Sequence, residues 1–331
     1  MVTNTATTSS KKITWRTILR VGFPILAAGA LVWLLHKIGW SQIGGALGQV
    51  GIRGAILLLI LGFLENTLDA AALLASMSKR IGLYRILSYN STGAIINNLV
   101  PGEAGEIFKG TMLKRHGSTQ DAIASTVLWN YIFKSSRPAA ALLAATTAWI
   151  LGHGVDPYIA GVVWGATVVA FAPYLIFKLL LHKGAAELIM HALQKVKLLR
   201  RDPEKLIVAA RELDEKIRRF RKERPKAYLG VFGCQFFARI TAWFTLYAAV
   251  KLVGLPYSFG LCALIYAGFS VSSYVVMLLP ARLGVSEAAG YLVFSLFGLN
   301  GAMGVIVYIV LRIKALVTNA IPAIFRPPSA R

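Results

Sequence analysis

Several ionisable side chains lie inside strongly apolar stretches of this sequence, where their charges need partners. Glu65 and Asp69 are four residues apart within residues 55–77, so on a helix they share one face, with Asn66 beside them. A charge at the centre of a membrane costs about 2.5 to 3.5 kcal/mol on insertion scales. We therefore expect these carboxylates to face a polar interior. The cations in apolar stretches that could pair with them are Lys134, Arg137, Arg239, Arg312 and Lys314.

Two short segments combine a proline, a glycine and a carboxylate within apolar surroundings. They are residues 97–106, NNLVPGEAGE, and residues 279–287, LPARLGVSE. In a membrane protein this combination is typical of interrupted helices, whose freed backbone groups are tolerated only where they line a cavity or are buried in protein. One such segment in each half of the chain predicts a duplicated, transporter-like scaffold with its site between the halves.

Together these groups indicate a polar cavity that holds a charged head group while the lipid tail stays in the bilayer. The planar guanidinium of Arg binds phosphate oxygens in pairs, and helix starts near 102–105 and 283–286 would add N–H donors. The alternative is a set of ion pairs that only hold helices together, or an Arg312 side chain that extends to the membrane interface. The sequence leaves both interpretations open.

The histidines and cysteines give no sign of a metal site or a catalytic nucleophile. The five His residues are scattered near span ends or in polar loops, and no two stand at ligand spacing. Cys234 and Cys262 lie in apolar segments, so we interpret them as small buried side chains. No H-E-x-x-H, P-loop or G-x-S-x-G pattern occurs. We expect no metal, no cofactor and no enzymatic activity.

The elements that must position these residues are membrane helices. The chain has 331 residues, of which 56% are hydrophobic, and its mean hydropathy is +0.62, which excludes a single soluble core. About 20 apolar residues cross a bilayer. The segments that meet this length are 21–35 (extendable to 40), 55–77, 122–151, 158–181, 227–253, 259–279 and 302–325. Residues 84–100 and 283–299 are shorter and predict re-entrant helices.

We therefore predict an all-α fold: a polytopic transmembrane helical bundle with about seven to eight spans, two Pro/Gly-interrupted re-entrant elements and halves that resemble a repeat. The predicted domains are a basic cytoplasmic N-terminal tail (1–20), a first transmembrane half (21–181), a basic amphipathic cytoplasmic linker (182–226), a second transmembrane half (227–325) and a C-terminal tail (326–331).

The charge of the chain points to a lipid surface. The net charge is +22, but the basic residues flank spans and fill the linker, so anionic lipid is a better partner than nucleic acid. Fourteen Lys and Arg and seven acidic residues lie in the linker, with apolar residues at helical spacing. A solvated helical connector and a lipid sensor both fit this pattern. The basic residues before the first span predict a cytoplasmic N-terminus.

The two Pro/Gly segments resemble a known family, the flippase-like membrane proteins related to the transmembrane domain of lysylphosphatidylglycerol synthases. The element N-x-x-x-P-x-x-x-G-E is matched by Asn97, Pro101, Gly105 and Glu106, with Lys109 shortly after. A later P-x-x-x-G-x-x-E element is matched by Pro280, Gly284 and Glu287, and a basic residue in the last span by Arg312. The resemblance covers roughly residues 20–325.

The resemblance implies a helical bundle that moves amphiphilic lipids between leaflets; cargo across such relatives includes aminoacylated phosphatidylglycerol and hopanoids. Many relatives carry an acidic-basic pair in the helix matching 126–137, whereas this chain has WNYIFK at 129–134. The missing carboxylate argues against a cationic aminoacyl head group. The synthase domain that would make such a lipid is not present in these 331 residues.

From the residues and the resemblance together we predict a flippase-like protein of the bacterial inner membrane that moves a phospholipid or a hopanoid. Its partners are membrane lipids and lipid-biosynthetic proteins, without nucleic acid. The predicted substrate-binding residues are Asn97, Pro101, Gly105, Glu106, Lys109, Arg137, Arg239, Pro280, Gly284, Glu287 and Arg312. Two alternatives are an integral-membrane enzyme acting on a lipid or polyprenyl phosphate, with Glu106 or Glu287 as general base, and a non-transporting scaffold that binds lipid-modifying enzymes through the linker.

Overall fold

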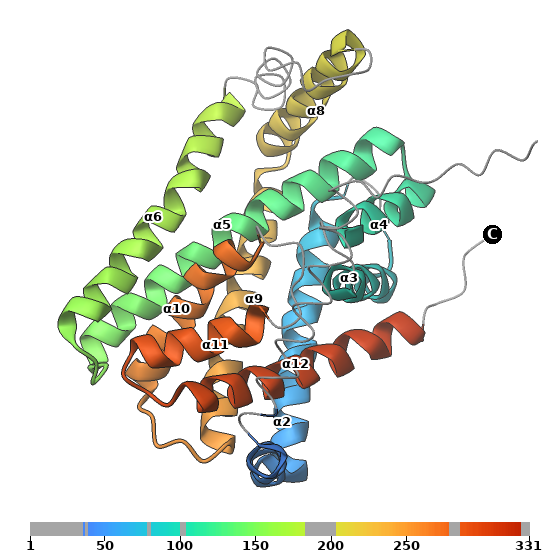
Figure 1. Ribbon diagram of the computed structural model, residues 1–331. Coiled ribbons are helices and arrows are strands. Elements are labelled where there is room, and N and C mark those ends of the chain that lie inside the picture. Colours follow the sequence, from blue (N-terminus) through green and yellow to red (C-terminus); the bar gives the residue numbers. More distant parts are fainter. Residues whose placement is uncertain are drawn as a thin grey trace, which may run out of the picture.

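The computed structural model describes residues 36, 39–77, 81–99, 104–182, 203–277 and 285–325, and every regular element in these ranges is helical (Figure 1). The helices are α2 (Trp40–Ala75), α3 (Leu83–Leu99), α4 (Ala104–Leu113), the 3-10 turn η1 (Lys114–His116), α5 (Thr119–Leu151), α6 (Pro157–His182), α8 (Pro203–Glu223), α9 (Pro225–Leu252), α10 (Phe259–Met277), α11 (Val285–Leu296) and α12 (Gly301–Ile324). The predicted all-α polytopic bundle is confirmed.

Some predicted features fall outside the described residues. They are both chain tails, the span at 21–35 and the two Pro/Gly breaks with Pro101, Pro280 and Gly284. Three helices are long and apolar enough to cross a membrane, namely α2 over Gly44–Ala75, α9 and α12, while Pro157–Ala172, Phe259–Tyr274 and Val285–Leu296 are shorter apolar helices. The total of seven to eight spans stays a prediction.

Helix α2 shows which side of the bundle faces lipid. Ile52, Ile56, Ile60 and Leu64 recur every four residues and are all exposed, so they form one apolar stripe along the helix. Only 17% of the most apolar window of α2 is buried. A contiguous apolar stripe of this kind on the outside of a protein indicates a membrane-facing surface. Glu65 and Asp69 lie on the inner side of the same helix.

Helices from both predicted halves pack against each other. Helix α2 lies along α9, α5 packs on α10, and α12 contacts α2 and α3 (Figure 1). One apolar cluster joins α9, α10, α11 and α12 to the C-terminal part of α5. A second joins the C-terminal part of α2 to α3, the start of α5 and α8. Helices from before and after residues 182–226 are thus interleaved in the fold. The division of the chain into two halves at these residues stays a prediction from sequence.

The helices that follow the two Pro/Gly segments are short. Helix α4 has 10 residues and α11 has 12, which gives lengths of about 15 and 18 Å at 1.5 Å per residue. A bilayer core is about 30 Å thick, so neither helix can cross it alone. Each carries one glutamate in its first turn, Glu106 and Glu287. Helix α11 lies in the predicted re-entrant segment 283–299, and the other predicted segment, 84–100, forms α3, which has 17 residues. Re-entry of either segment stays a prediction.

Glycines allow each short helix to approach its neighbour closely. A Cβ atom built on Gly105 of α4 would lie 1.9 Å from the carbonyl oxygen of Gly93 on α3. In the same way, a Cβ on Gly304 of α12 would lie 2.3 Å from the carbonyl oxygen of Gly290 on α11. Small residues at such crossings let membrane helices pack backbone to backbone. Both short helices are thus fixed by glycine contacts.

The linker contains α8, whose apolar face packs on the bundle. Ile217 is buried in the second apolar cluster, and Phe220 packs against it. Lys216 Nζ lies 2.8 Å from Asp121 Oδ1 at the start of α5, and Arg224 Nη1 donates to the Met77 carbonyl at 2.9 Å. Ile217 and Phe220, two of the apolar residues that made the linker a candidate lipid sensor, therefore contact protein, whereas the charged side chains of Arg218 and Arg219 are exposed.

The glycine crossing between α11 and α12 yields a stability prediction. Gly304→Ala inserts a methyl group against the backbone of Gly290 and should destabilise the protein by about 1 to 3 kcal/mol, the usual cost of overpacking. We expect a lower melting temperature in detergent, followed by fluorescence-detected size exclusion.

Gly161→Ala in α6 is the matched control, because a Cβ there meets no atom within 4 Å. It should leave the melting temperature unchanged or raise it slightly. An equal effect of both substitutions would contradict the proposed crossing.

Candidate functional site

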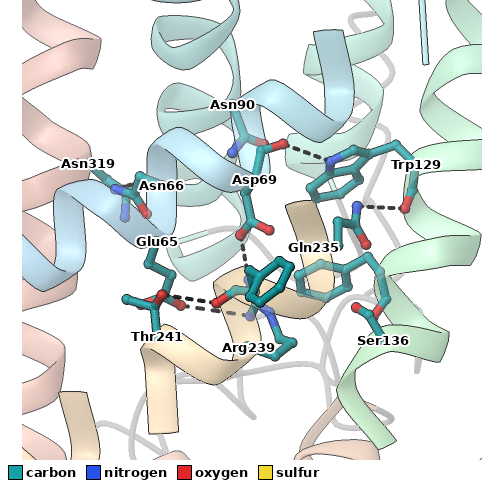
Figure 2. A network of polar contacts seen from close by, with 12 residues as sticks. Glu65, Asn66, Asp69, Asn90, Trp129, Ser136, Gln235, Arg239, Thr241 and Asn319 are labelled. Atoms are coloured by element: carbon teal, nitrogen blue, oxygen red, sulfur yellow. Dashed lines mark hydrogen bonds and ion pairs between the residues drawn. The ribbon is translucent and has the colours of Figure 1, made fainter. Parts of the chain in front are cut away.

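The central element of the polar interior is Arg239 on α9, which is 5% exposed. Its Nη2 atom lies 2.5 Å from Asp69 Oδ2, and its Nη1 atom lies 3.7 Å from Glu65 Oε1. Figure 2 shows the guanidinium between the two carboxylates, which come from successive turns of α2. The four-residue spacing predicted that Glu65 and Asp69 lie on the same face of a helix, and in the structure Arg239 contacts both of them.

A second cation joins α12 to this group. Lys314 Nζ lies 2.9 Å from the other oxygen of Glu65, Oε2. Next to Glu65 on α2, Asn66 Nδ2 donates to Asn319 Oδ1 at 3.4 Å (Figure 2). The chain Lys314, Glu65, Arg239 and Asp69 therefore ties together α12, α2 and α9, three helices far apart in the sequence.

The first Pro/Gly motif ends in a buried cluster on α3, α4 and α5. Lys109 is 2% exposed, and its Nζ atom lies 2.8 Å from Glu106 Oε1, 3.2 Å from Asn90 Oδ1 and 3.9 Å from the centre of the Trp129 ring. Asn97 accepts a hydrogen bond from the Gly105 N–H at 2.7 Å and donates to Glu106 at 3.1 Å. Asn97 thus satisfies an N–H at the start of α4, as a capping residue does.

Trp129 on α5 connects the two clusters. Its indole Nε1 donates to the Asp69 carbonyl at 3.0 Å, and its own carbonyl accepts from Gln235 Nε2 at 3.0 Å (Figure 2). Since Lys109 sits over the ring of the same tryptophan, α5 is held between α2, α4 and α9. The orientation of the ionic groups therefore depends on α5 as well.

Arg137, two turns further along α5, has a different environment. Its Nη1 atom donates to Ser273 Oγ on α10 at 2.8 Å, and its guanidinium carbon lies 5.1 Å from the centre of the Phe133 ring. The guanidinium of Arg239 lies 4.8 Å from the same ring. Among the described residues, no carboxylate lies within ion-pair distance of Arg137.

These groups surround two cavities. The larger, of about 360 Å³, is bordered by residues of α2, α3, α4, α5, α9, α10, α11 and α12. The smaller, of about 220 Å³, is lined by apolar side chains such as Leu246 and Phe269, together with hydroxyl groups of α10. Both cavities share the residues Glu65, Arg137, Arg239, Ser273, Ser286, Tyr308 and Lys314. They are therefore adjacent parts of one polar interior.

The lining of the larger cavity carries more positive than negative charge. Of its described residues, five are cationic, Lys109, Lys134, Arg137, Arg239 and Lys314, and three are anionic, Glu65, Asp69 and Glu106. Each of the three carboxylates is in an ion pair. Three further buried atoms, Asp69 Oδ1, Glu106 Oε2 and Arg239 Nε, have no hydrogen-bond partner among the described residues, so a polar occupant would satisfy them.

The structure places the predicted site residues in three groups. Asn97, Glu106, Lys109, Arg137 and Arg239 line the larger cavity. Gly105 contributes the close contact with α3. Glu287, which is 1% exposed, and Arg312 pair with each other across α11 and α12 and are not among the cavity-lining residues.

Other lining residues were not predicted as part of the site. Ser273, Trp129 and Asn319 lie on apolar helices in which a hydroxyl, an indole or an amide is common. For Trp129 and Asn319 the available signal was their position on the same helices as predicted cations, whereas α10, which carries Ser273, contains no cation. In the described part of the chain, no group of three His, Cys, Asp or Glu side chains could hold a metal ion.

The ion cluster yields a prediction about stability. Arg239→Ala leaves the buried carboxylate of Asp69 without its cation and removes one of the two cations of Glu65; breaking a buried pair on one side costs about 3 to 5 kcal/mol. The purified variant should show a strongly lowered melting temperature in detergent and reduced abundance in membranes. Asp69→Asn combined with Arg239→Gln should recover part of the loss, because no unpaired charge remains at that position.

The control is Arg53→Ala, since Arg53 is an exposed cation on α2. Its melting temperature should match that of the unsubstituted protein. Equal stability of Arg239→Ala and Arg53→Ala would contradict a structural role for the Arg239 ion pairs.

Comparison with known proteins identifies the family to which the chain belongs. No curated protein matches the chain. The family model described as the lysylphosphatidylglycerol synthase TM region matches residues 19–323, a range that covers nearly the whole chain and includes every described helix except the last residue of α12. The match agrees with the resemblance carried by the two Pro/Gly motifs, and the chain therefore belongs to the lysylphosphatidylglycerol synthase TM region family.

Proposed function

We propose that this protein is a flippase-like lipid transporter that moves an amphiphilic lipid, such as a phospholipid or a hopanoid, between membrane leaflets. The observation that carries the proposal is the charged cavity of about 360 Å³ inside a bundle whose outer surface is apolar. A lipid head group has to leave water to cross the bilayer, and moving a charge into an apolar medium without partners is prohibitively costly. A cavity lined with charges and amides replaces those partners.

The size and composition of the two cavities fit an amphiphile. Binding sites for small ligands commonly measure about 300 to 1,000 Å³, and the larger cavity lies in this range. Its walls are polar, whereas Ala242, Leu246 and Phe269 in the smaller cavity are apolar. A head group fits the first environment and the adjoining part of its tail fits the second.

The proposed location is the bacterial inner membrane, with the N-terminus and α8 on the cytoplasmic side. Basic residues gather at that end by the positive-inside rule, and the exposed face of α8 carries Arg218 and Arg219. Anionic head groups of the cytoplasmic leaflet attract such surfaces. Membrane lipids are the proposed partners, together with enzymes that make the transported lipid.

We propose transport without chemical conversion. Glu106 accepts hydrogen bonds from Lys109 and Asn97, and Glu287 pairs with Arg312. Each carboxylate considered as a general base is thus already held by a donor, whereas a general base must be within reach of the proton that it removes. Recovery of a chemically altered lipid after incubation with the purified protein would favour the enzyme instead.

A transport assay tests the proposal. Proteoliposomes with fluorescent phospholipids in both leaflets should expose the inner-leaflet probe to an impermeant quencher much faster than protein-free vesicles. Ala94→Trp places an indole in the larger cavity, since Ala94 lies in its lining, and should slow transfer at least tenfold.

Ala288→Trp is the matched control, because Ala288 is exposed on α11 and the new side chain faces outward. It should transport at the unsubstituted rate. Equal, slow transfer with and without protein would overturn the transport function, and equal rates for the two Trp variants would exclude this cavity as the path.

A further inference from the structure

The charges of the cavity distinguish Arg137 from three of the other cations. Lys109, Arg239 and Lys314 each pair with a carboxylate. Arg137 has a neutral partner, the hydroxyl of Ser273. A guanidinium has five N–H donors, and within the described part of the chain only the one bonded to Ser273 has a hydrogen-bond acceptor. The remaining donors are available to a ligand.

The position of Arg137 suits an anion. It lines both cavities, as does Ser273, so the two side chains lie where the polar and apolar chambers meet. The hydroxyls of Ser270 and Ser272 line the smaller cavity close by. The hydroxyls of Ser272 and Ser273 donate to the carbonyls of Phe269 and Ser270, so the donors left for a ligand are those of the guanidinium. A planar guanidinium in polar surroundings is a typical environment for phosphate oxygens, which accept paired charge-assisted hydrogen bonds.

The same residues disfavour a cation. Five cationic and three anionic side chains line the larger cavity, and all three carboxylates are engaged. An ammonium group entering here would meet like charges, and the two carboxylate oxygens without a partner, Asp69 Oδ1 and Glu106 Oε2, belong to carboxylates that Arg239 and Lys109 already neutralise. A neutral polyol would leave the guanidinium of Arg137 without a countercharge in a low-dielectric interior.

We propose that Arg137 binds the phosphate of a net-anionic lipid head group, and that the transported class is anionic phosphate-bearing lipids in place of neutral or aminoacylated, cationic ones. This inference rests on the proposed transport function. It assigns Arg137 as the residue that determines head-group specificity, with Ser273 as its positioning partner.

The first measurement is binding to the purified full-length protein in detergent. Short-chain phosphatidylglycerol should bind at least tenfold more tightly than short-chain lysylphosphatidylglycerol, measured by isothermal titration. Arg137→Gln should weaken binding of phosphatidylglycerol at least tenfold, and Arg137→Lys should weaken it less. Arg53→Gln, at an exposed position of α2, is the matched control and should bind normally.

Folding and the source of the phosphate are checked separately. The melting temperature of Arg137→Gln should stay close to that of the unsubstituted protein, because no carboxylate of the described residues loses its partner. If this variant fails to fold, Ser273→Ala replaces it and should weaken phosphatidylglycerol binding severalfold.

Inorganic phosphate should compete only at concentrations far above those of the lipid; equal competition would assign the site to free phosphate and overturn the lipid assignment.

The second measurement is transport by proteoliposomes of fluorescent phosphatidylglycerol, phosphatidylcholine and lysylphosphatidylglycerol. The anionic probe should move fastest, and Arg137→Gln should remove that preference. Equal rates for the three probes, or unchanged phosphatidylglycerol binding by Arg137→Gln and Ser273→Ala, would overturn the head-group assignment. Arg137-dependent, selective binding without transport of any probe would support the assignment and contradict the transport function.

Discussion

Carboxylates inside an apolar bundle must be paired with cations, and this constraint organises the rest of the structure. Glu65 and Asp69 cannot stay ionised on α2 unless α9 and α12 bring Arg239 and Lys314 to them. The helix that carries the exposed apolar stripe therefore also carries, on its inner face, the carboxylates that join it to α9 and α12. Its position relative to α9 and α12 follows from charge as much as from side-chain packing.

The same pairing leaves space for a guest molecule. The ionic groups line the cavity and do not fill it. Two of the ion pairs join α2 to α9 and to α12, and the third lies within α4, next to α3. Ion pairs that hold helices together and ion pairs that line a binding site were alternatives at the level of sequence. In the structure one set of residues, Glu65, Arg239 and Lys314, does the first and is positioned for the second.

Hydropathy and charge spacing predicted much of this fold, but they did not predict which charged side chains pair with each other. Apolar runs gave helices α5, α6, α9, α10 and α12 within a few residues of their ends, because burial in lipid requires continuous apolar length. The i, i+4 spacing of Glu65 and Asp69 predicted a shared face. The choice of Arg239 over Lys134 or Arg137 as their cation depends on how α9 packs along α2, which no local pattern encodes. Helix α8 was ambiguous for the same reason, since an apolar stripe fits lipid and protein equally well.

The contrast between Arg239 and Arg137 explains why only one of them is suited to a cargo that must also leave. A phosphate that captured Arg239 would strand the carboxylate of Asp69 in the interior, so binding there would carry the cost of an unpaired buried charge. A phosphate at Arg137 displaces at most the hydroxyl of Ser273, a neutral acceptor, and its departure restores that hydrogen bond. Transport requires binding strong enough for entry and weak enough for release, as in channels. Of these two arginines, Arg137 is the one whose partner allows that exchange.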